Sequence, residues 1–337
     1  MEKRRHANIP IFIPHLGCPN DCVFCNQRTI SGHLDFDPSD VVGEIDRALS
    51  TIGDRDAEIA FFGGSFTGID RTLMVSLLDT AQSYVDSGRV TGIRMSTRPD
   101  YIDEEIIGIL SHYTVSAVEL GIQSTDDRVL AACRRGHNTE ASERACRMLT
   151  EAGFSLVGQM MIGLPEATPA SEVRTAEDIC AFGASAARVY PTVVFRGTCL
   201  CRMAQEGSYT PLRDADAVQR SASVLDVFDR HNVTLLRVGL CASENLSSDE
   251  EVYGGANHPA IGELAMGELF FRRICESLGE EKKPRRIILS VAPGAVSKAV
   301  GQKKSNIIRL REALGVRVEK VREDRELSGY GIKIQEI

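Results

Sequence analysis

The chain has 337 residues, of which 43% are hydrophobic, so it is long and apolar enough for one large domain and one small one. Ten cysteines without a secretory signal indicate free thiols in a reducing cytoplasm, which excludes a disulfide-stapled secreted protein, and no apolar run is long enough to cross a membrane. The net charge of −8 is unevenly distributed along the chain. Residues 282–337 carry 14 Lys and Arg against 6 Asp and Glu, a net charge of +8, whereas residues 1–281 carry −16. This asymmetry predicts either an anionic partner for the tail or a solvated basic face.

Apolar runs alternate with amphipathic stretches over about the first 195 residues. The runs predict strands at 9–14, 58–62, 92–95, 116–120, 156–162 and 187–194, with helices near 39–51, 70–86, 102–111, 126–151 and 169–182. This alternation predicts an α/β fold with a parallel sheet and helical crossovers, a partial (β/α)6 barrel of the TIM type. Helices near 214–231 and 258–278, flanking a strand at 233–238, complete a first domain of residues 1–278.

The remainder of the chain predicts a small α+β module. A charged stretch with one proline, 279–285, is interpreted as a linker, and residues 286–337 form the module. It is expected to contain a strand at 287–291, a helix at 294–300, a tight turn at 301–304, a second helix at 305–314 stopped by Gly315, and a strand at 317–321.

Three cysteines follow the first predicted strand: Cys18, Cys22 and Cys25, with the spacing C-x3-C-x2-C. Soft thiolates select zinc or iron–sulfur clusters, and three ligands are one short of a closed zinc site or an all-cysteine cluster. The missing ligand predicts that a non-protein group binds the last metal position. A zinc site completed by a distant ligand such as His15, or three buried structural thiols, remain alternatives, although the turn-forming residues 19–21 disfavour burial.

Polar or glycine-containing motifs stand at the ends of the other five strands as well. Because chemistry in such barrels lies at the carboxyl ends of the strands, we expect these motifs to meet the cysteines. Glycines allow close backbone approach, hydroxyls and amides offer hydrogen bonds, and a carboxylate on an apolar strand needs a partner, either a ligand or a structural arginine. The candidate ligand-binding residues are Gly63, Gly64, Ser65, Ser96, Glu119 and Gln123, and Arg98 offers a planar fork suited to a carboxylate.

Two further groups are weighed beside this site. Arg134, Arg135 and His137 lie near it, where a capping or surface role is the simpler interpretation. Cys199 and Cys201 would share one face of a strand and could hold an auxiliary cluster with Cys241, although buried free thiols are commoner.

The cysteine spacing, with Phe24 before the third cysteine, resembles the signature of the radical SAM superfamily. The resemblance implies a 4Fe–4S cluster on Cys18, Cys22 and Cys25, which would be the catalytic residues. It also implies that S-adenosylmethionine (SAM) binds the unique iron, in a pocket formed by Phe24 and the six candidates above. SAM would be cleaved to a 5′-deoxyadenosyl radical with electrons from a donor such as ferredoxin or flavodoxin.

A longer run of motifs over about residues 8–200 resembles the catalytic subunit of Elongator and its short bacterial relatives. The stretches are CPNDCVFCNQRTISG, FFGGSFTGI, STRPDYID, VELGIQSTDDRVL, RRGH, GQMMIGLP and RVYPTVV. This resemblance implies RNA, and tRNA in particular, as the substrate. We expect no acetyltransferase domain after these motifs, and the first cysteine spacing is the general superfamily one, so the carboxymethyl chemistry is not carried over. The GIQS and RGH stretches also look like oxygen-independent coproporphyrinogen oxidases, which leaves a small tetrapyrrole-type substrate open, and a non-catalytic metal-binding RNA adaptor is the other alternative.

The tail sequence VSKAVGQKKSNIIRLREALG resembles a KH domain of the NusA type, whose G-x-x-G loop clamps a nucleic-acid backbone. Here the loop reads Gly301-Gln302-Lys303-Lys304, with a lysine in place of the second glycine. The alternative is a basic cap that serves packing or dimerisation. The RNA contacts that the resemblance implies are Lys298, Gly301, Lys303, Lys304, Arg309 and Arg311.

Overall fold

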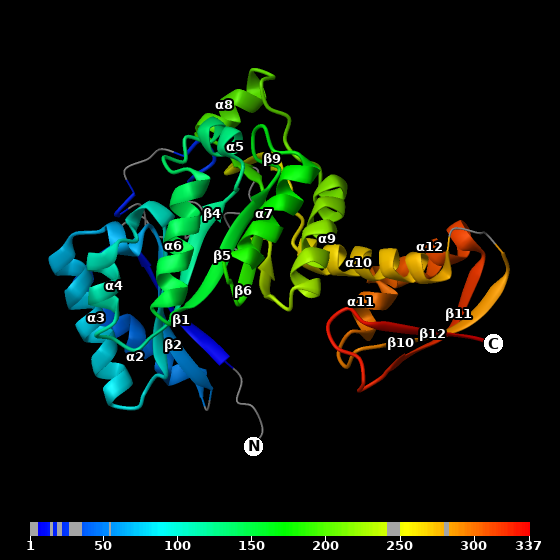
Figure 1. Cartoon of the computed structure of the whole chain (residues 1–337), viewed down its shortest axis with the longest axis horizontal. Helices are drawn as coiled ribbons and strands as arrows, with labels where there is room; N and C mark the ends of the chain where they lie inside the picture. The colour runs from blue at the N-terminus through cyan, green and yellow to red at the C-terminus, as the bar shows by residue number, and fades with distance from the viewer. Residues whose placement is uncertain are drawn as a thin grey trace.

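The main body of the chain is a parallel sheet that curls into an open, partial barrel (Figure 1). The computed structural model describes residues 6–13, 16–18, 22–26, 36–53, 55–240, 250–279 and 283–337. Seven strands lie in the order β1-β2-β3-β4-β5-β6-β8, and each is parallel to its neighbours. This order confirms the predicted partial TIM-type barrel. The strands are β1 (His6–Ile13), β2 (Asp56–Gly63), β3 (Gly92–Thr97), β4 (Val115–Gln123), β5 (Ser155–Ile162), β6 (Ala186–Pro191) and β8 (Thr234–Val238).

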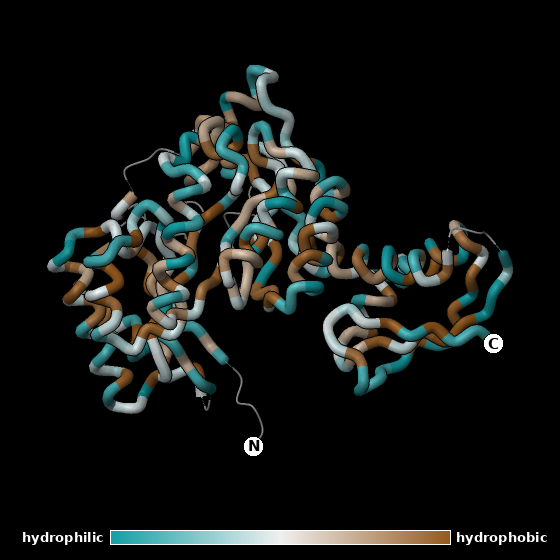
Figure 2. Tube along the Cα trace, viewed as in Figure 1, coloured by the Kyte–Doolittle hydropathy of each residue, from teal (hydrophilic) through white to brown (hydrophobic). Residues whose placement is uncertain are grey.

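Helices connect successive strands. Buried side chains of strands and helices form one large core, and Figure 2 shows hydrophobic residues along the strands and interspersed with hydrophilic ones along the helices. Such burial explains why the central strands read as continuous apolar runs. The helices are α2 (Val41–Ile52), α3 (Arg71–Asp86), α4 (Glu104–Leu110), α5 (Asp127–Ala132), α6 (Thr139–Glu151), α7 (Pro169–Ala181) and α9 (Asp214–Arg230).

The single helix predicted over 126–151 is wrong, because the structure divides it into α5 and α6. Arg134 and Gly136 between them have φ values of 52° and 82°, which a right-handed helix does not accommodate. The side chain of Asn138 then caps α6 by accepting a hydrogen bond from the Ala141 N–H. The break forms a connecting loop at the carboxyl end of the barrel strands.

The strand predicted over 187–194 also divides. β6 ends at Pro191, and β7 (Val193–Phe195) pairs antiparallel with β9 (Val252–Gly255) in a separate two-stranded sheet. Cys199 and Cys201, which would share a face if they lay on a strand, lie instead in helix α8 (Cys199–Gln205), where residues two apart do not share a face. Cys201 is buried among apolar side chains, and Cys241 lies outside the described residues.

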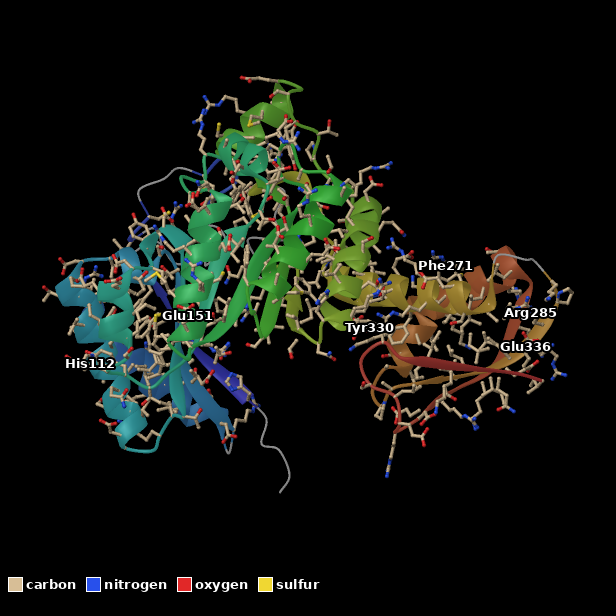
Figure 3. The ribbon with its side chains drawn as sticks, in the orientation of Figure 1. His112, Glu151, Phe271, Arg285, Tyr330 and Glu336 are labelled. Carbon is tan, nitrogen blue, oxygen red and sulfur yellow. The ribbon has the colours of Figure 1, made fainter. Side chains whose placement is uncertain are left out.

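The tail module has the predicted order of elements. It consists of β10 (Arg285–Val291), α11 (Val296–Val300), a 3-10 turn over Gln302–Lys304, α12 (Ser305–Leu314) and β11 (Val316–Glu323). A further strand, β12 (Ile332–Glu336), was not predicted. It pairs antiparallel with β10, opposite the parallel neighbour β11, and Arg285 of β10 lies 3.4 Å from Glu336 in an ion pair (Figure 3).

Helix α10 (Ile261–Leu278) connects the barrel with the tail (Figure 1). Its first half packs Ala265 and Leu269 against α9, whereas Phe270, Ile274 and Leu278 belong to the tail core. The division at 278 and the linker at 279–285 stay predictions, but the packing joins the second half of α10 to the tail. In the described part of the chain, no helix combines the length and apolarity needed to cross a bilayer.

Candidate active site

A cavity of about 330 Å³ lies at the carboxyl ends of the barrel strands. Every residue predicted from the sequence to bind the cluster or SAM lines it, so the structure brings segments from β1 to β4 to one place. Met161, Arg188 and Tyr190 from β5 and β6 complete the wall. The predicted residues are Cys18, Cys22, Phe24, Cys25, Gly63, Gly64, Ser65, Ser96, Glu119 and Gln123.

Glycines let the cysteine loop pack tightly on the end of β2. The Ser65 N–H donates a 3.1 Å hydrogen bond to the Leu16 carbonyl, and a Cβ on Gly64 would lie 2.3 Å from that same oxygen. Gly17 is in the left-handed region with φ 69°, and a Cβ there would lie 2.3 Å from the Ser65 carbonyl. Approach to a ligand was the predicted reason for the glycines, but in this structure they allow close contact between two backbone segments.

The other side of the cysteine loop is held by helices. The Val23 N–H donates to the Cys133 carbonyl at 3.1 Å, and the Val23 carbonyl accepts from the Leu200 N–H at 2.7 Å. Val23 is buried with Leu200 in a satellite core that Phe24 also contacts. Backbone hydrogen bonds from the end of α5 and the start of α8 therefore fix the residue between Cys22 and Phe24.

Two buried arginines face the thiols. Nη1 of Arg98 lies 3.9 Å from the Cys18 sulfur, and Nη1 of Arg135 lies 3.5 Å from the Cys22 sulfur. Arg98 also forms a two-bond ion pair with Asp100, at 2.9 and 2.7 Å, and donates to the Arg135 carbonyl at 2.6 Å. Burial opposes ionisation of Asp100, but the hydrogen bonds and charge of Arg98 outweigh it, so the pKa of Asp100 is lowered.

The surface or capping role predicted for the 134–137 segment is wrong for Arg135 and His137. Arg134 is exposed as expected, but Arg135 is 7% exposed and His137 9%. Burial, reinforced by the positive charge of Arg135, lowers the pKa of His137 to about 4, so the imidazole is neutral at pH 7. The one sequence signal in the RRGH stretch is Gly136, which predicts a turn and has φ 82° in the structure, but it does not identify Arg135 and His137 as buried.

Glu119 lies at the base of the cavity and is 1% exposed. Its two carboxylate oxygens accept from Arg188 at 2.8 and 3.2 Å, from Arg94 at 3.2 Å and from Gln159 at 3.0 Å. Arg94 continues the network to Glu58 at 2.8 Å. The sequence left either a ligand or a structural arginine as the partner of the Glu119 carboxylate, and the structure shows structural arginines. Arg188 was not predicted as a partner, because nothing in the local sequence pattern connects β6 with β4.

The hydroxyl of Ser65 is also occupied within the protein. It accepts a 3.1 Å hydrogen bond from the Arg98 N–H and lies 3.1 Å from the hydroxyl of Thr97, which contacts Thr67 at 2.6 Å. These bonds tie the loop after β2 to the loop after β3. Ser65 lines the cavity, but its side chain serves this connection.

Unlike Glu119 and Ser65, Gln123 has a buried side-chain carbonyl oxygen with no hydrogen-bond partner among the described residues. Its backbone has φ 68°, a conformation that a non-glycine residue adopts at a cost, and the β4–β5 register shifts beside it. A buried, unsatisfied acceptor costs about 1–3 kcal/mol. The oxygen is thus suited to accept a hydrogen bond from a ligand hydroxyl or ammonium group in the cavity.

The donor set of the cavity fits the iron–sulfur group implied by the cysteine spacing. Three thiols from one short loop line one cavity, and two of them face guanidinium groups. As placed, they are not gathered around a single point: among the described residues, no three Cys, His, Asp or Glu side chains form a group that could hold a metal ion. Thiolate is the ligand form that iron–sulfur clusters require.

Comparison with known families assigns the chain. The model of the radical SAM superfamily matches residues 12–179, and the model of the radical SAM C-terminal domain matches residues 184–269. The chain belongs to the radical SAM superfamily, whose cofactors are a 4Fe–4S cluster and SAM.

Individual relatives point to the Elongator branch that the motifs resemble. A tRNA uridine(34) acetyltransferase of Methanocaldococcus jannaschii is 28% identical over 160 residues, which are 46% of this chain and 29% of that protein. Elongator complex protein 3 of Homo sapiens is 29% identical over 137 residues, 40% of this chain and 25% of that protein. These two matches therefore span less than a third of each relative.

Among solved structures, an archaeal Elp3 from Methanocaldococcus infernus, lacking its N-terminus, superposes with a TM-score of 0.62 at 19% identity. The superposition covers 82% of this chain and 64% of that one, and it supports the fold.

The residues predicted to contact RNA divide into two groups. Lys303, Lys304 and Arg311 are exposed, and Lys303 and Lys304 have φ values of 52° and 63°. Of these two lysines, Lys304 stands where the KH loop has its second glycine. Gly301 at φ 76° is needed for the turn, since a Cβ there would lie 2.4 Å from the Ser305 hydroxyl. The KH assignment itself stays a prediction.

The other two basic residues are used differently. Arg309 forms a 2.7 Å ion pair with Glu268, and its guanidinium group lies 3.6 Å from the centre of the Phe271 ring. Both partners belong to helix α10, so the positive charge of Arg309 is paired within the protein. Lys298 is half-buried and lines a second cavity between α9 and the tail, together with Arg273 and Tyr330. Lys298 and Arg309 thus make contacts at the tail–barrel junction, and their contact with RNA stays a prediction.

Proposed function

We propose that this chain is an enzyme that uses SAM and a 4Fe–4S cluster to modify RNA, with tRNA as the substrate. The observation that supports this most strongly is the single cavity that combines the three cysteines, the unsatisfied oxygen of Gln123 and the charged base around Glu119. The similarity to tRNA uridine(34) acetyltransferases supports the substrate class.

Each part of the cavity has a proposed role. Cys18, Cys22 and Cys25 would ligate the cluster, which supplies the electron that cleaves SAM to methionine and a 5′-deoxyadenosyl radical. The oxygen of Gln123 would accept a hydrogen bond from SAM, and Phe24, Ser96 and the backbone at Gly63 and Gly64 would complete its pocket. Glu119 would act through others, by holding Arg188 and Gln159 in place. The apolar walls exclude water from a reactive species.

The proposed RNA surface is the exposed turn of the tail, formed by Lys303, Lys304 and the nearby Arg311 of α12. These side chains offer positive charge to a phosphate backbone on a chain whose first 281 residues carry −16. All described cysteines are free thiols, which supports a reducing cytoplasm as the place of action. The electron donor is proposed to be a small carrier such as ferredoxin or flavodoxin.

The first experiment tests the chemistry. Protein reconstituted anaerobically with iron and sulfide, then given SAM and dithionite, is expected to form 5′-deoxyadenosine, which is measured by chromatography. Cys22→Ala is expected to abolish the product. Cys146→Ala is the matched control, because this buried thiol lies on α6 and does not line the cavity, and it should retain the product. A zinc-loaded protein without product would overturn the proposal in favour of the RNA adaptor.

The second experiment tests the substrate class. Bulk tRNA is expected to accelerate 5′-deoxyadenosine formation and to bind with a strong salt dependence, and Lys303→Glu with Lys304→Glu is expected to weaken binding and reduce the slope of log K against log salt by about 2. Lys320→Glu, an exposed change on β11, should affect binding less. Indifference to tRNA, with acceleration by coproporphyrinogen, would refute an RNA substrate and favour the small-molecule alternative.

A further inference from the structure

A second cavity, of about 620 Å³, lies at the junction between the barrel and the tail. Its walls come from the end of α9 and from β8 in the barrel, from α10, and from two glycine-containing loops of the tail, residues 292–295 and 328–331. Tyr330, labelled in Figure 3, belongs to the second of these loops. Among the described residues, this junction cavity shares no lining residue with the cavity of the cysteines, so it is a separate space.

The walls of the junction cavity are tied together by contacts between its elements. Arg273 of α10 forms ion pairs with Asp226 and Asp229 of α9, at 2.7 and 2.8 Å. The guanidinium group of Arg273 also lies 5.7 Å from the centre of the Tyr330 ring. Gly329 brings the tail loop so close to α9 that a Cβ there would lie 2.3 Å from Oδ1 of Asp229. The cavity is therefore formed before any ligand binds, as is usual for small-molecule sites.

The charged residues that line the junction cavity are Asp229, Arg273 and Lys298. Asp229 and Arg273 pair with each other, and Asp226 pairs with both Arg273 and Arg230, so this group of two arginines and two aspartates is neutral. Lys298 of α11 is half-buried, and its ammonium group has no ion pair among the described residues. The lining therefore carries one uncompensated positive charge, which favours an anionic ligand.

The uncharged part of the lining combines polar groups with an apolar wall. Burial raises the pKa of Tyr330, so its hydroxyl stays protonated at pH 7 and can donate a hydrogen bond. Met266 and Phe270 contribute to the apolar wall, and the volume lies within the range of roughly 300–1,000 Å³ that small-molecule sites have. The polar side chains of the lining are Asn232, Thr234, Ser328 and Tyr330.

We propose that the junction cavity binds a nucleotide, with its phosphate group at Lys298 and its base against the apolar wall of α9 and α10. A bare phosphate would leave the apolar wall uncovered, and a purely apolar ligand would leave the charge of Lys298 without a partner. A lysine ammonium binds phosphate as a point charge, and the amide and hydroxyl groups of the lining suit the hydroxyls of a ribose.

The nucleotide has two sources. Lys298 lies in the helix that leads into the turn with Lys303 and Lys304, so a nucleotide of an RNA strand held at that turn is one source. A free mononucleotide is the other. The first source rests on the proposed function, whereas the second does not.

Isothermal titration calorimetry of the full-length, reconstituted protein tests the site, with SAM in excess and no reductant so that the cysteine cavity is occupied. At least one of the four nucleoside 5′-monophosphates is expected to bind, and its nucleoside and inorganic phosphate should each bind about tenfold more weakly or worse. Lys298→Gln should weaken binding of the monophosphate about tenfold, because a hydrogen bond between charged groups is lost, whereas Lys298→Arg should retain most of the affinity.

Lys320→Gln is the matched control for the calorimetry. It removes an exposed lysine of β11 that does not line the junction cavity, and it should leave the affinity unchanged. The chain contains no tryptophan, so Tyr330→Trp places a single fluorescent reporter in the wall of the cavity. Its emission should change as the monophosphate binds, and the midpoint should shift about tenfold when Lys298→Gln is added.

A single-stranded tetranucleotide distinguishes the two sources. If it competes with the monophosphate and its affinity also falls in Lys298→Gln, the site takes a nucleotide of an RNA strand; if it does not compete, the site takes a free nucleotide. The proposal is overturned if no monophosphate binds, or if the monophosphate binds equally well to Lys298→Gln and to the unchanged protein. A nucleotide that enters the cysteine cavity instead would give this second result. No readout requires cleavage of SAM or modification of tRNA, so failure here is distinct from failure of the proposed function.

Discussion

The charge network at the base of the barrel gives a prediction whose magnitude follows from the structure. Glu119→Gln removes the negative charge that two arginines share, while keeping the size of the side chain. Glu119 is 1% exposed, and the side chains of Arg94 and Arg188 are each 13% exposed, so solvent screens the pairs little. Arg94 keeps Glu58, but Arg188 loses both of its bonds to a carboxylate.

Removing one partner of a buried ion pair costs about 3–5 kcal/mol, because it leaves an uncompensated charge in a poorly solvated place. The new amide also points a donor at guanidinium donors. We therefore expect Glu119→Gln to lower the free energy of unfolding of the metal-free protein by about 3–5 kcal/mol. Urea unfolding followed by circular dichroism measures the change. Asp216→Asn is the control, because the Arg213–Asp216 pair is at the surface and its loss should leave the unfolding midpoint unchanged.

A double-mutant cycle makes the reasoning refutable. Arg188→Met added to Glu119→Gln removes the stranded charge and replaces it with an apolar side chain of similar length. The double variant should therefore be more stable than the sum of the single effects predicts, with a coupling of about 0.5–3 kcal/mol. If Glu119→Gln lowers the free energy of unfolding by less than about 1 kcal/mol, or if the effects in the cycle are strictly additive, the ion pairs of Glu119 do not stabilise the fold as their geometry indicates.

Three further predictions concern the cysteine loop, the buried histidine and the tail. Gly64→Ala places a Cβ 2.3 Å from the Leu16 carbonyl and should displace the loop, which is measured as lost iron per chain, whereas Gly108→Ala, with open space around it on α4, should retain iron. The pKa of His137 is lowered from 6.5 to about 4, so as the pH falls the unfolded chain binds the proton before the folded one does. The free energy of unfolding should therefore be highest above pH 6.5 and fall by about 3 kcal/mol as the pH drops towards 4. The His137→Gln variant should lack this pH dependence. Asn306→Ala removes donors to the Gly267 and Ala299 carbonyls and should destabilise the tail by about 1–3 kcal/mol, seen as faster hydrogen exchange in α12 while the barrel is unchanged.

The barrel could be predicted because its signals are local. A parallel strand buried on both faces reads as an apolar run, a crossover helix as an amphipathic stretch, and their alternation leaves few topologies. Helix 305–314 was predicted with the bounds that the structure has, since the turn before it and Gly315 after it mark both ends. The placement of motifs at strand ends then brought every candidate ligand residue to the cavity.

The incorrect predictions concern residues whose partners and burial depend on contacts between segments that are distant in the sequence. Nothing near Glu119 in the sequence identifies Arg188 as its partner, because the two meet only when β4, β5 and β6 lie side by side. Arg135 reads as a surface residue until the break between α5 and α6 directs it towards Cys22. Strand β12 is short and only partly buried, so it becomes recognisable through its pairing with β10.

The position of the tail turn relative to the cavity is set by one helix. Val193 lines the cavity, and the adjacent Thr192 carbonyl accepts from the Ala256 N–H at 3.1 Å, shortly before α10 begins. Glu263, in the first turn of α10, accepts from Gln302 at 3.4 Å. Because the turn is tied to the first turn of α10, a nucleic acid held at Lys303 and Lys304 would lie at a restricted distance from the cavity. Under the proposed function, we expect the tail to select substrates by the spacing between a backbone segment and the nucleotide to be modified, and the acidic body to disfavour other approaches.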